Sequence, residues 1–275
     1  MAVQIADSIS NGRAIPGFRL EAEPQEILYL DFELSDKQFE VRYSENYTNH
    51  YRFHKNFYRA KIYTEAEMPK EFKSFEEYLN LSLNEILEKI NAKILIIDNI
   101  TYLSSETEKA KDALPLMKHL KALKNKFGLS ILVLAHTPKR DLTKPLTRND
   151  LQGSKMRINF CDSALTIGES STDKSLRYIK QIKVRNSDLV FDKNNVAVCR
   201  IDKTCNFLHF IFHEYGSEQE HLKHLSEEDT TRLENGILEL SLSSPELSYA
   251  QIADKLGTYK MKVKRILDRN NASQS

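Results

Sequence analysis

The sequence lacks tryptophan and has only eight glycines, seven prolines and three cysteines among its 275 residues. The odd number of cysteines and the absence of a C-x-x-C pair argue against a disulfide framework and against a cysteine-based metal site. Apolar runs such as ILVLA at residues 131–135 are far shorter than the roughly 20 residues that span a bilayer. The N-terminus does not have the basic and apolar regions of a signal peptide. We therefore expect a cytoplasmic protein with reduced thiols and no membrane partner.

Two further absences concern charge and nucleotide binding. Forty basic residues balance 39 acidic residues, so the overall charge of +1 indicates neither a nucleic-acid nor a membrane partner. Any contact with DNA must then come from local clusters of basic side chains. The sequence also contains no G-x-x-x-x-G-K-[ST] segment, the Walker A loop that cradles the phosphates of a bound nucleotide.

Short apolar runs alternate with helical patterns over the first two thirds of the chain. Strands are predicted at residues 26–31, 57–63, 93–98 and 129–135. Helices are predicted at residues 2–10, 35–46, 75–90 and 106–126. This alternation predicts an α/β domain with a mainly parallel twisted sheet that helices cover on both faces. Further strands are predicted at residues 164–167, 176–184, 196–201 and 207–212, the last ones antiparallel.

Two of the predicted strands end in acidic residues. The strand KILIID ends at Asp98, and ligands bind at the carboxyl ends of the strands in open parallel sheets. A carboxylate there can hold the water shell of Mg²⁺ that bridges terminal phosphates, although an acid in this position is also a common helix cap or surface group. In LYLDFELS at residues 28–35, period-two alternation predicts Asp31 and Glu33 on the same side of the strand's end.

Together these segments resemble the RecA-fold ATPases, especially the hexameric plasmid-replication helicases of the RepA type and their DnaB and RadA relatives. The resemblance implies ATP and Mg²⁺ as ligands, with Asp98 placing the metal through water. It also implies that Glu33 polarises the attacking water, because the family has an LxxE-like segment at this point. Glu33 can instead cap the helix that begins near Ser35. The family further implies a homo-oligomeric ring such as a hexamer.

The resemblance extends to the next strand and the loop after it. The segment ILVLAHTP resembles the family strand whose polar end senses the γ-phosphate, which implies this role for His136. The basic loop that follows, with Lys139, Arg140 and Arg148, is implied to face DNA, although it can also be a solvated connection. The segment DLQGSK at residues 150–155 resembles part of the family's second nucleic-acid-facing region.

The segment QIKVRN at residues 181–186 resembles the K-x-R motif of DnaB-type motors. Lys183 and Arg185 are thereby implied to reach the γ-phosphate held by a neighbouring subunit, where positive charge stabilises the transferring phosphoryl group. The alternative is a pair of exposed cations on an amphipathic strand. These motifs, taken in the family's order, predict a RecA-like core over residues 1–215.

The predicted first helix resembles the stretch that follows the family's phosphate-binding loop. The lysine of that loop is therefore expected about three residues before Met1. We interpret the absence as a truncated chain or a misassigned start rather than as a natural protein without the loop. The chain as printed is expected to bind ATP poorly and to be inactive as an ATP hydrolase.

The last part of the sequence predicts a separate helical module. Residues 216–229 are charged and contain glycine and serine, which is typical of a linker. In residues 230–275, Ala253, Gly257 and Val263 have the spacing of a helix-turn-helix, with or without a wing. Its second helix carries basic residues suited to DNA phosphates, namely Lys260, Lys262, Lys264, Arg265 and Arg269. A helical bundle that contacts other proteins is the alternative.

These observations predict a DNA-associated RecA-like ATPase, a RepA-type helicase or a related motor that serves replication of a plasmid or another mobile element. The rival hypothesis is a DNA-binding regulator in which a degenerate, non-hydrolysing core serves only for assembly. A fold of this kind supports several functions, so the choice depends on the site.

Overall fold

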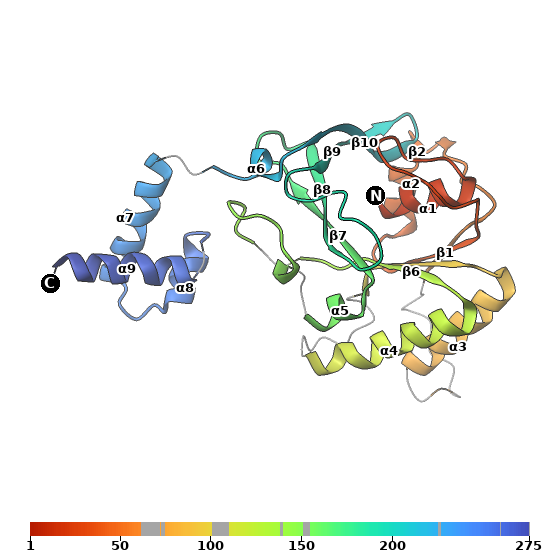
Figure 1. The fold of residues 1–275 in the computed structure, drawn as a ribbon, viewed down its shortest axis with the longest axis horizontal. Coiled ribbons are helices and arrows are strands. Elements are labelled where there is room, and N and C mark those ends of the chain that lie inside the picture. Colours follow the sequence, from red (N-terminus) through yellow and green to blue (C-terminus); the bar gives the residue numbers. More distant parts are fainter. Residues whose placement is uncertain are drawn as a thin grey trace. The chain divides into compact units, whose positions relative to one another are not determined.

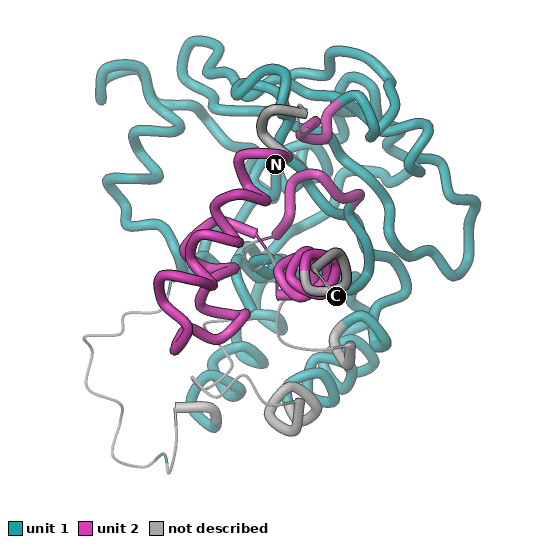
Figure 2. The backbone as a smooth tube through the Cα atoms, turned by 90° about the vertical axis from the view of Figure 1, so that its left-hand side faces the viewer, with its two compact units in different colours: residues 1–138, 146–220 teal, residues 139–145, 221–275 magenta. Residues whose placement is uncertain are grey.

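The computed structural model describes residues 1–61, 72, 75–100, 110–137, 140–150, 155–224, 227–258 and 260–274. The chain forms two compact units (Figure 2). The first unit comprises residues 1–138 and 146–220, and the second comprises residues 139–145 and 221–275. Each unit has a hydrophobic core of its own. Within the described ranges, no helix is long and apolar enough to cross a membrane.

A four-stranded parallel sheet lies in the first unit, with the strand order β4-β1-β5-β6. The strands are β1 (Ile27–Asp31), β4 (Phe57–Lys61), β5 (Ile94–Asp98) and β6 (Ser130–Val133). All of β1 is buried, and so is β5 except for its last residue, which is typical of strands that are covered on both faces. The register places Asp31 beside Asp98 at the carboxyl ends of β1 and β5.

Helices cover both faces of this sheet (Figure 1). On one face, Leu87 of α3 (Phe75–Ile90) and Leu120 of α4 (Ala110–Phe127) share a core with Leu95 of β5. On the other face, Ala6 of α1 (Ala2–Asn11) packs in a core with Tyr29 of β1. In β1, the neighbouring residues Leu28 and Tyr29 enter different cores, because successive side chains of a strand point to opposite faces. The predicted α/β fold with a parallel, doubly covered sheet is confirmed.

The helix that was predicted at residues 35–46 is shorter in the structure. α2 (Asp36–Arg42) begins at the predicted cap, where the Ser35 side chain accepts a hydrogen bond from the Gln38 amide and the Gln38 side chain bonds back. The chain then turns through Asn46 and Tyr47, which both have positive φ. This turn joins the short strands β2 (Ser44–Glu45) and β3 (Asn49–His50), and a left-handed backbone cannot continue a right-handed helix.

The later strands form a separate four-stranded antiparallel sheet with the order β10-β9-β8-β7. They are β7 (Ser163–Glu169), β8 (Leu176–Val184), β9 (Val196–Thr204) and β10 (Phe207–Gly216). The 3-10 helix η2 (Arg148–Asp150) and the helix α5 (Lys155–Phe160) precede this sheet in the chain. All four strands were predicted, and their antiparallel pairing is confirmed.

The beginning of the predicted linker at residues 216–229 differs from the structure. A short helix, α6 (Glu218–His221), directly follows β10. The Glu218 carboxylate is buried, pairs with Nζ of Lys180 at 2.5 Å and accepts a hydrogen bond from the Leu146 amide at 2.7 Å. A buried charge of this kind has to be paired, so residues up to Glu220 belong to the first unit.

Three helices form the core of the second unit: α7 (Glu227–Ser243), α8 (Tyr249–Lys255) and α9 (Lys260–Gln274). Their buried contacts include Ile237, Ala253 and Val263. The turn between α8 and α9 contains Gly257 with φ of 62°, and the Thr258 amide donates to the Ala253 carbonyl at 2.8 Å. This hydrogen bond is the helix-ending pattern that favours glycine. In residues 227–258 and 260–274 the structure contains no strand, so it describes no wing.

Candidate active site

Three side chains meet just beyond the carboxyl ends of adjacent parallel strands. Glu33 follows β1, Asn99 follows β5, and His136 follows β6. The Asn99 side-chain amide donates to a carboxylate oxygen of Glu33 at 3.2 Å and lies 2.9 Å from Nε2 of His136. The same carboxylate oxygen of Glu33 lies 3.8 Å from Nε2 of His136. Residues more than 60 positions apart in the sequence are therefore brought together by the sheet order.

The three side chains differ in their exposure to solvent. The side chains of Glu33 and His136 are 48% and 58% exposed, whereas Asn99 is only 8% exposed. A carboxylate and an imidazole are thus open to a ligand or to water, and a buried amide lies between them. This arrangement suits a group that has to reach a substrate yet be held in one orientation.

Asp98 lies at the end of β5, beside this group. The buried Tyr29 hydroxyl of β1 donates a short hydrogen bond to the Asp98 carboxylate. Burial raises the pKa of Asp98, the Tyr29 hydrogen bond opposes this, and the nearby carboxylates of Glu33 and Asp31 raise the pKa further. Burial and the Asp98 charge also raise the pKa of Tyr29, so this phenol remains a donor. A divalent cation would relieve the repulsion among these acids.

Asp31 has a structural environment that differs from that of Glu33. Its carboxylate is buried, accepts hydrogen bonds from the backbone amides of Glu33 and Leu34, and pairs with Arg59 of β4 at 2.8 Å. Asp31 and Glu33, which were predicted on the same side of the strand's end, have different partners. The strand ends at Asp31, so the alternation of a strand does not extend to Glu33.

The donor set fits Mg²⁺ but supplies no phosphate cradle. Mg²⁺ keeps several waters and is held by one or two carboxylates together with substrate phosphates, and Asp98 lies where this requires a carboxylate. Among the described residues, no group of three or more acidic, histidine or cysteine side chains is arranged to hold a metal ion alone. The backbone loop and lysine of a G-x-x-x-x-G-K-[ST] motif are not present in these 275 residues.

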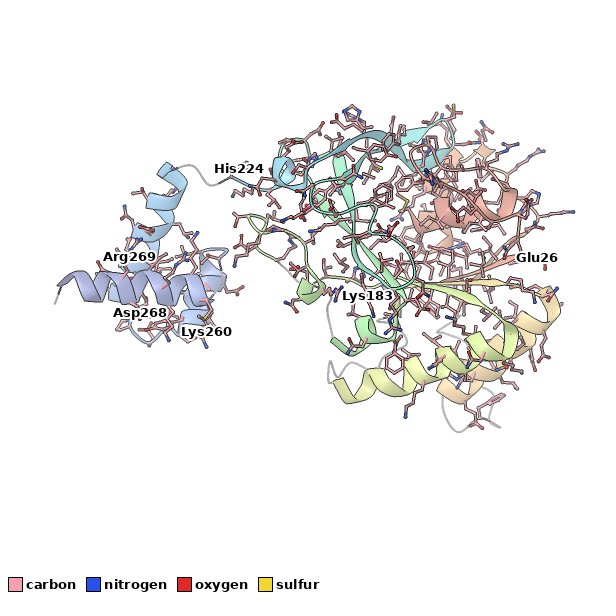
Figure 3. The ribbon with its side chains drawn as sticks, in the orientation of Figure 1. Glu26, Lys183, His224, Lys260, Asp268 and Arg269 are labelled. Atoms are coloured by element: carbon pink, nitrogen blue, oxygen red, sulfur yellow. The ribbon has the colours of Figure 1, made fainter. Side chains whose placement is uncertain are left out.

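Lys183 lies in β8 of the antiparallel sheet and Arg185 directly follows this strand, and both residues contact α5 or the residues after it. Lys183 is buried in β8, and its ammonium donates to the backbone carbonyls of Ile158 and, at 3.4 Å, Asn159 (Figure 3). Burial lowers the pKa of Lys183, and the neighbouring Arg185 charge lowers it further. Arg185 is half-exposed and contacts the Asn159 carbonyl at 2.8 Å and Asp162 at 3.3 Å.

The predicted basic loop is only partly described. Lys139 and residues 151–154 of the DLQGSK segment lie outside the described residues. Arg140 donates to the backbone carbonyl of Lys144, which keeps this guanidinium within its own loop. The exposed Arg148 in η2 donates to the Ile182 carbonyl of β8 at 2.8 Å. The two described arginines therefore stabilise local backbone as well as carrying positive charge.

The basic residues predicted to contact DNA lie on α9, where Figure 3 labels Lys260 and Arg269. Lys260, Lys264 and Arg265 are exposed, and Lys262 is half-buried. Arg269 pairs with Glu234 of α7 at 2.7 Å. The buried residues Val263 and Ile266 fix which face of α9 is turned away from the core, so the exposed cations share one surface.

Three residues in or beside the group of Glu33, Asn99 and His136 were not identified as site residues from the sequence. Tyr29 and Asn99 had a signal, because Tyr29 carries a hydroxyl within the apolar part of its strand and Asn99 directly follows the strand-ending Asp98. Arg59 had none, because its pairing with Asp31 depends on β4 lying beside β1. Strand order cannot be obtained from one sequence.

A parallel α/β sheet with carboxylates and an imidazole at the ends of adjacent strands has the architecture of a nucleotide-hydrolysing ATPase domain. Residues 1–141 match the family model of the AAA domain. This match covers more than half of the chain, and the chain belongs to that family. No curated protein matches it. A solved KaiC-like protein from the hyperthermophilic archaeon Pyrococcus horikoshii is similar with a TM-score of 0.44 and 11% identity, over 69% of this chain and 76% of that chain.

Proposed function

We propose that the chain is the hydrolytic core and DNA-binding module of a RepA-type motor, an ATPase linked to replication of a plasmid or another mobile element. The observation that carries the proposal is the convergence of Glu33 and His136 beside Asp98 at the ends of adjacent strands. A carboxylate with a purely structural role, as an alternative for Asp98, does not explain why an exposed carboxylate and an exposed imidazole lie beside it. An ATP-hydrolysing site uses an acid that holds Mg²⁺ through water, a base for the attacking water and a polar group at the terminal phosphate, and these three residues can supply them.

The residues have distinct roles in this proposal. Asp98 holds the water shell of Mg²⁺, and the Tyr29 hydroxyl orients its carboxylate. Glu33 accepts the proton of the attacking water, because its exposed carboxylate can act as a general base. His136 contacts the terminal phosphate and reports its presence. When bound, the Mg²⁺–ATP complex supplies the phosphoanhydride and the charge neutralisation for phosphoryl transfer.

ATP turnover tests the assignment of Glu33. The measurement uses the 275-residue chain and, where the gene encodes a phosphate-binding loop upstream in frame, the extended form as well. We expect poor ATP binding by the 275 residues alone and turnover by the form that carries the loop. Glu33→Gln should reduce that turnover by about 100-fold or more, whereas the exposed Glu88→Gln should leave it unchanged. Equal, measurable turnover by the loop-carrying form with and without Glu33→Gln would refute the proposed base.

The second unit is proposed to bind DNA through α9. The exposed cations Lys260, Lys264 and Arg265 support this, because a helix with several free cations on one surface suits the phosphates that border a major groove. Lys262 belongs to the same interface, and Arg269 contributes only if it leaves Glu234. Lys139, Arg140 and Arg148 are proposed as additional contacts from the loop after β6.

Titration of a labelled DNA duplex at several salt concentrations tests this interface. Lys264→Ala and Arg265→Ala should each weaken binding and reduce the slope of log affinity against log salt by about 1. Lys174→Ala, an exposed lysine of the other unit, is the matched control and should change neither quantity. If neither α9 variant changes the affinity or the slope, the module serves protein contacts instead of DNA binding.

We further propose a homo-oligomeric ring such as a hexamer, in which Lys183 and Arg185 act on the neighbouring subunit's nucleotide. The half-exposed guanidinium of Arg185 supports its part. Lys183 would first have to leave the backbone carbonyls of Ile158 and Asn159. Light scattering with and without ATP and DNA measures the mass of the assembly, and a monomer under all conditions would exclude the ring.

A DNA-binding regulator with a non-hydrolysing core is the second candidate. Two observations favour it: the 275 residues contain no phosphate-binding motif, and Lys183 is held by backbone carbonyls of its own chain. A regulator should bind DNA with an affinity that ATP does not change. The motor should instead show DNA-stimulated turnover in the form that carries the loop, and its affinity for DNA should respond to ATP.

A further inference from the structure

The amide of Asn99 has a fixed orientation, because one of its partners is a carboxylate. Glu33 can only accept hydrogen bonds when ionised, so the nitrogen of the Asn99 amide, and not its oxygen, has to face Glu33. The same nitrogen lies 2.9 Å from Nε2 of His136. An amide nitrogen has no lone pair to offer, so Nε2 of His136 has to be the acceptor in this contact. The neutral ring then carries its proton on Nδ1.

We propose that Asn99 is a positioning residue that keeps His136 from pairing with Glu33. Nε2 of His136 lies only 3.8 Å from the Glu33 carboxylate. If Nε2 carried the ring proton, a small rotation would let it donate directly to Glu33. That hydrogen bond would engage a further lone pair of the Glu33 carboxylate and make it a weaker base toward water. By donating to both groups, Asn99 holds Nε2 unprotonated and separates the base from the imidazole.

The burial of Asn99 makes this separation effective. The residue is 8% exposed, whereas the two groups that it holds are about half-exposed. Its position directly after the buried β5 fixes the amide, while solvent can still reach Glu33 and His136. The inference concerns how the proposed hydrolytic site is arranged, and it therefore rests on the proposed function for its catalytic meaning. The tautomer of His136 itself depends on the geometry alone.

Nitrogen-15 NMR of the histidine rings in the 275-residue chain tests the proposal without nucleotide. At about pH 8.5, well above the usual titration range of histidine, each ring is neutral and its two nitrogens show which one carries the proton. His136→Ala identifies the His136 signals. In the unmodified chain we expect Nε2 of His136 to be unprotonated. In Asn99→Ala, and in the nearly isosteric Asn99→Leu, we expect the proton to move to Nε2.

Asn84→Ala is the matched control, because the Asn84 amide donates to a backbone carbonyl inside α3. This variant should leave the His136 signals unchanged. Asn99→Asp provides a variant of the same shape that accepts instead of donating, and it should also move the proton to Nε2. Circular dichroism confirms that each variant is folded, and either Asn99→Leu or Asn99→Asp suffices if Asn99→Ala unfolds.

The outcomes separate this inference from the proposed ATPase function. A protonated Nε2 in the unmodified chain, or the same tautomer in all folded Asn99 variants, would overturn the positioning role whatever the activity. The expected tautomers together with absence of turnover in the loop-carrying form would retain the arrangement and reject the ATPase. In a form that does turn over ATP, Asn99→Leu should reduce turnover by about 10-fold or more, and adding His136→Ala should not reduce it further.

Discussion

The two four-stranded sheets of the first unit place their charged residues in different ways. In β1 and β5 of the parallel sheet, the acids stand at the carboxyl ends, because both faces of those strands are buried. In β8 of the antiparallel sheet, Lys180 and Lys183 lie within the strand and are buried. Their partners come from segments 24 to 38 residues away, which include Ile158 and Glu218.

This difference separates residues that are open to a ligand from residues that hold the fold together. Glu33 and His136 are half-exposed beyond the carboxyl ends of the parallel strands, and the Asn99 side chain contacts both of them. The lysines of β8 instead fix backbone segments: Lys180 holds Leu146 and Glu218, and Lys183 holds the end of α5. A charged residue at the end of a parallel strand is therefore a better functional candidate in this chain than one inside an antiparallel strand. The substitutions below test this distinction.

The largest effect is expected from Glu218→Ala, which removes the acid that pairs with Lys180. The change leaves a buried ammonium without its carboxylate and the Leu146 amide without its acceptor. Removal of one partner of a buried ion pair costs about 3–5 kcal/mol of the free energy of unfolding. Urea unfolding followed by circular dichroism measures this loss.

Asp162→Ala is the control for Glu218→Ala. Asp162 also pairs with cations, Lys124 and Arg185, but all three side chains are about half-exposed. Its removal should cost far less free energy of unfolding than removal of Glu218, since exposed pairs contribute little. Similar losses in Asp162→Ala and Glu218→Ala would show that burial of the β8 lysines does not govern the stability of the antiparallel sheet.

Arg59→Ala applies the same change to the parallel sheet. Asp31 would lose its guanidinium partner but keep the hydrogen bonds from the amides of Glu33 and Leu34. We therefore expect a smaller loss in the free energy of unfolding than for Glu218→Ala, about 2–4 kcal/mol. Lys61→Ala, which removes a contact with the exposed Asp36, should cost less than Arg59→Ala in the same urea experiment. A larger loss for Arg59→Ala than for Glu218→Ala would reverse the order of the two sheets.

The contrast between the sheets also explains what the sequence could predict. The apolar runs ending in Asp98 and before His136 indicate strands and their ends, because local pattern determines both. The capping pair Ser35 and Gln38 was predictable for the same reason. The partners of Arg59, Lys180 and Lys183 were not, because each contact depends on strand order or on a segment distant in the sequence. The proposed role of Lys183 in a neighbouring subunit remains a prediction.

Asp98→Asn should stabilise the protein, which is the opposite of the two preceding changes. Burial and the charges of Glu33 and Asp31 raise the pKa of Asp98, so folding favours its protonated form. The destabilisation from this carboxylate is absent below its ordinary pKa near 4, grows as the pH rises through the raised pKa, and is then constant. Asparagine can still accept from Tyr29 and carries no charge.

The stabilisation by Asp98→Asn should therefore be small at about pH 4 and reach about 0.5–2 kcal/mol at neutral pH. Thermal unfolding at several pH values between these limits measures the difference from the unmodified chain. Asp162→Asn is the control, because neighbouring cations lower the pKa of that exposed carboxyl, and its removal should not stabilise the fold. A destabilised Asp98→Asn at neutral pH would mean that the acids at the edge of the parallel sheet are structural, as the lysines of β8 are.

The smallest effect is expected from Arg185→Ala, and it bears on the two cations of the K-x-R segment. Arg185 follows β8 and is half-exposed, so removal of its contacts with Asn159 and Asp162 should cost at most about 1 kcal/mol. Lys183→Ala should cost more in the same urea experiment, because the buried ammonium holds two backbone carbonyls at the end of α5. Arg185 would then be free to serve a neighbouring subunit, while Lys183 belongs to the architecture of its own chain. Equal costs for the two variants would remove this distinction and return the segment to a matched pair of cations.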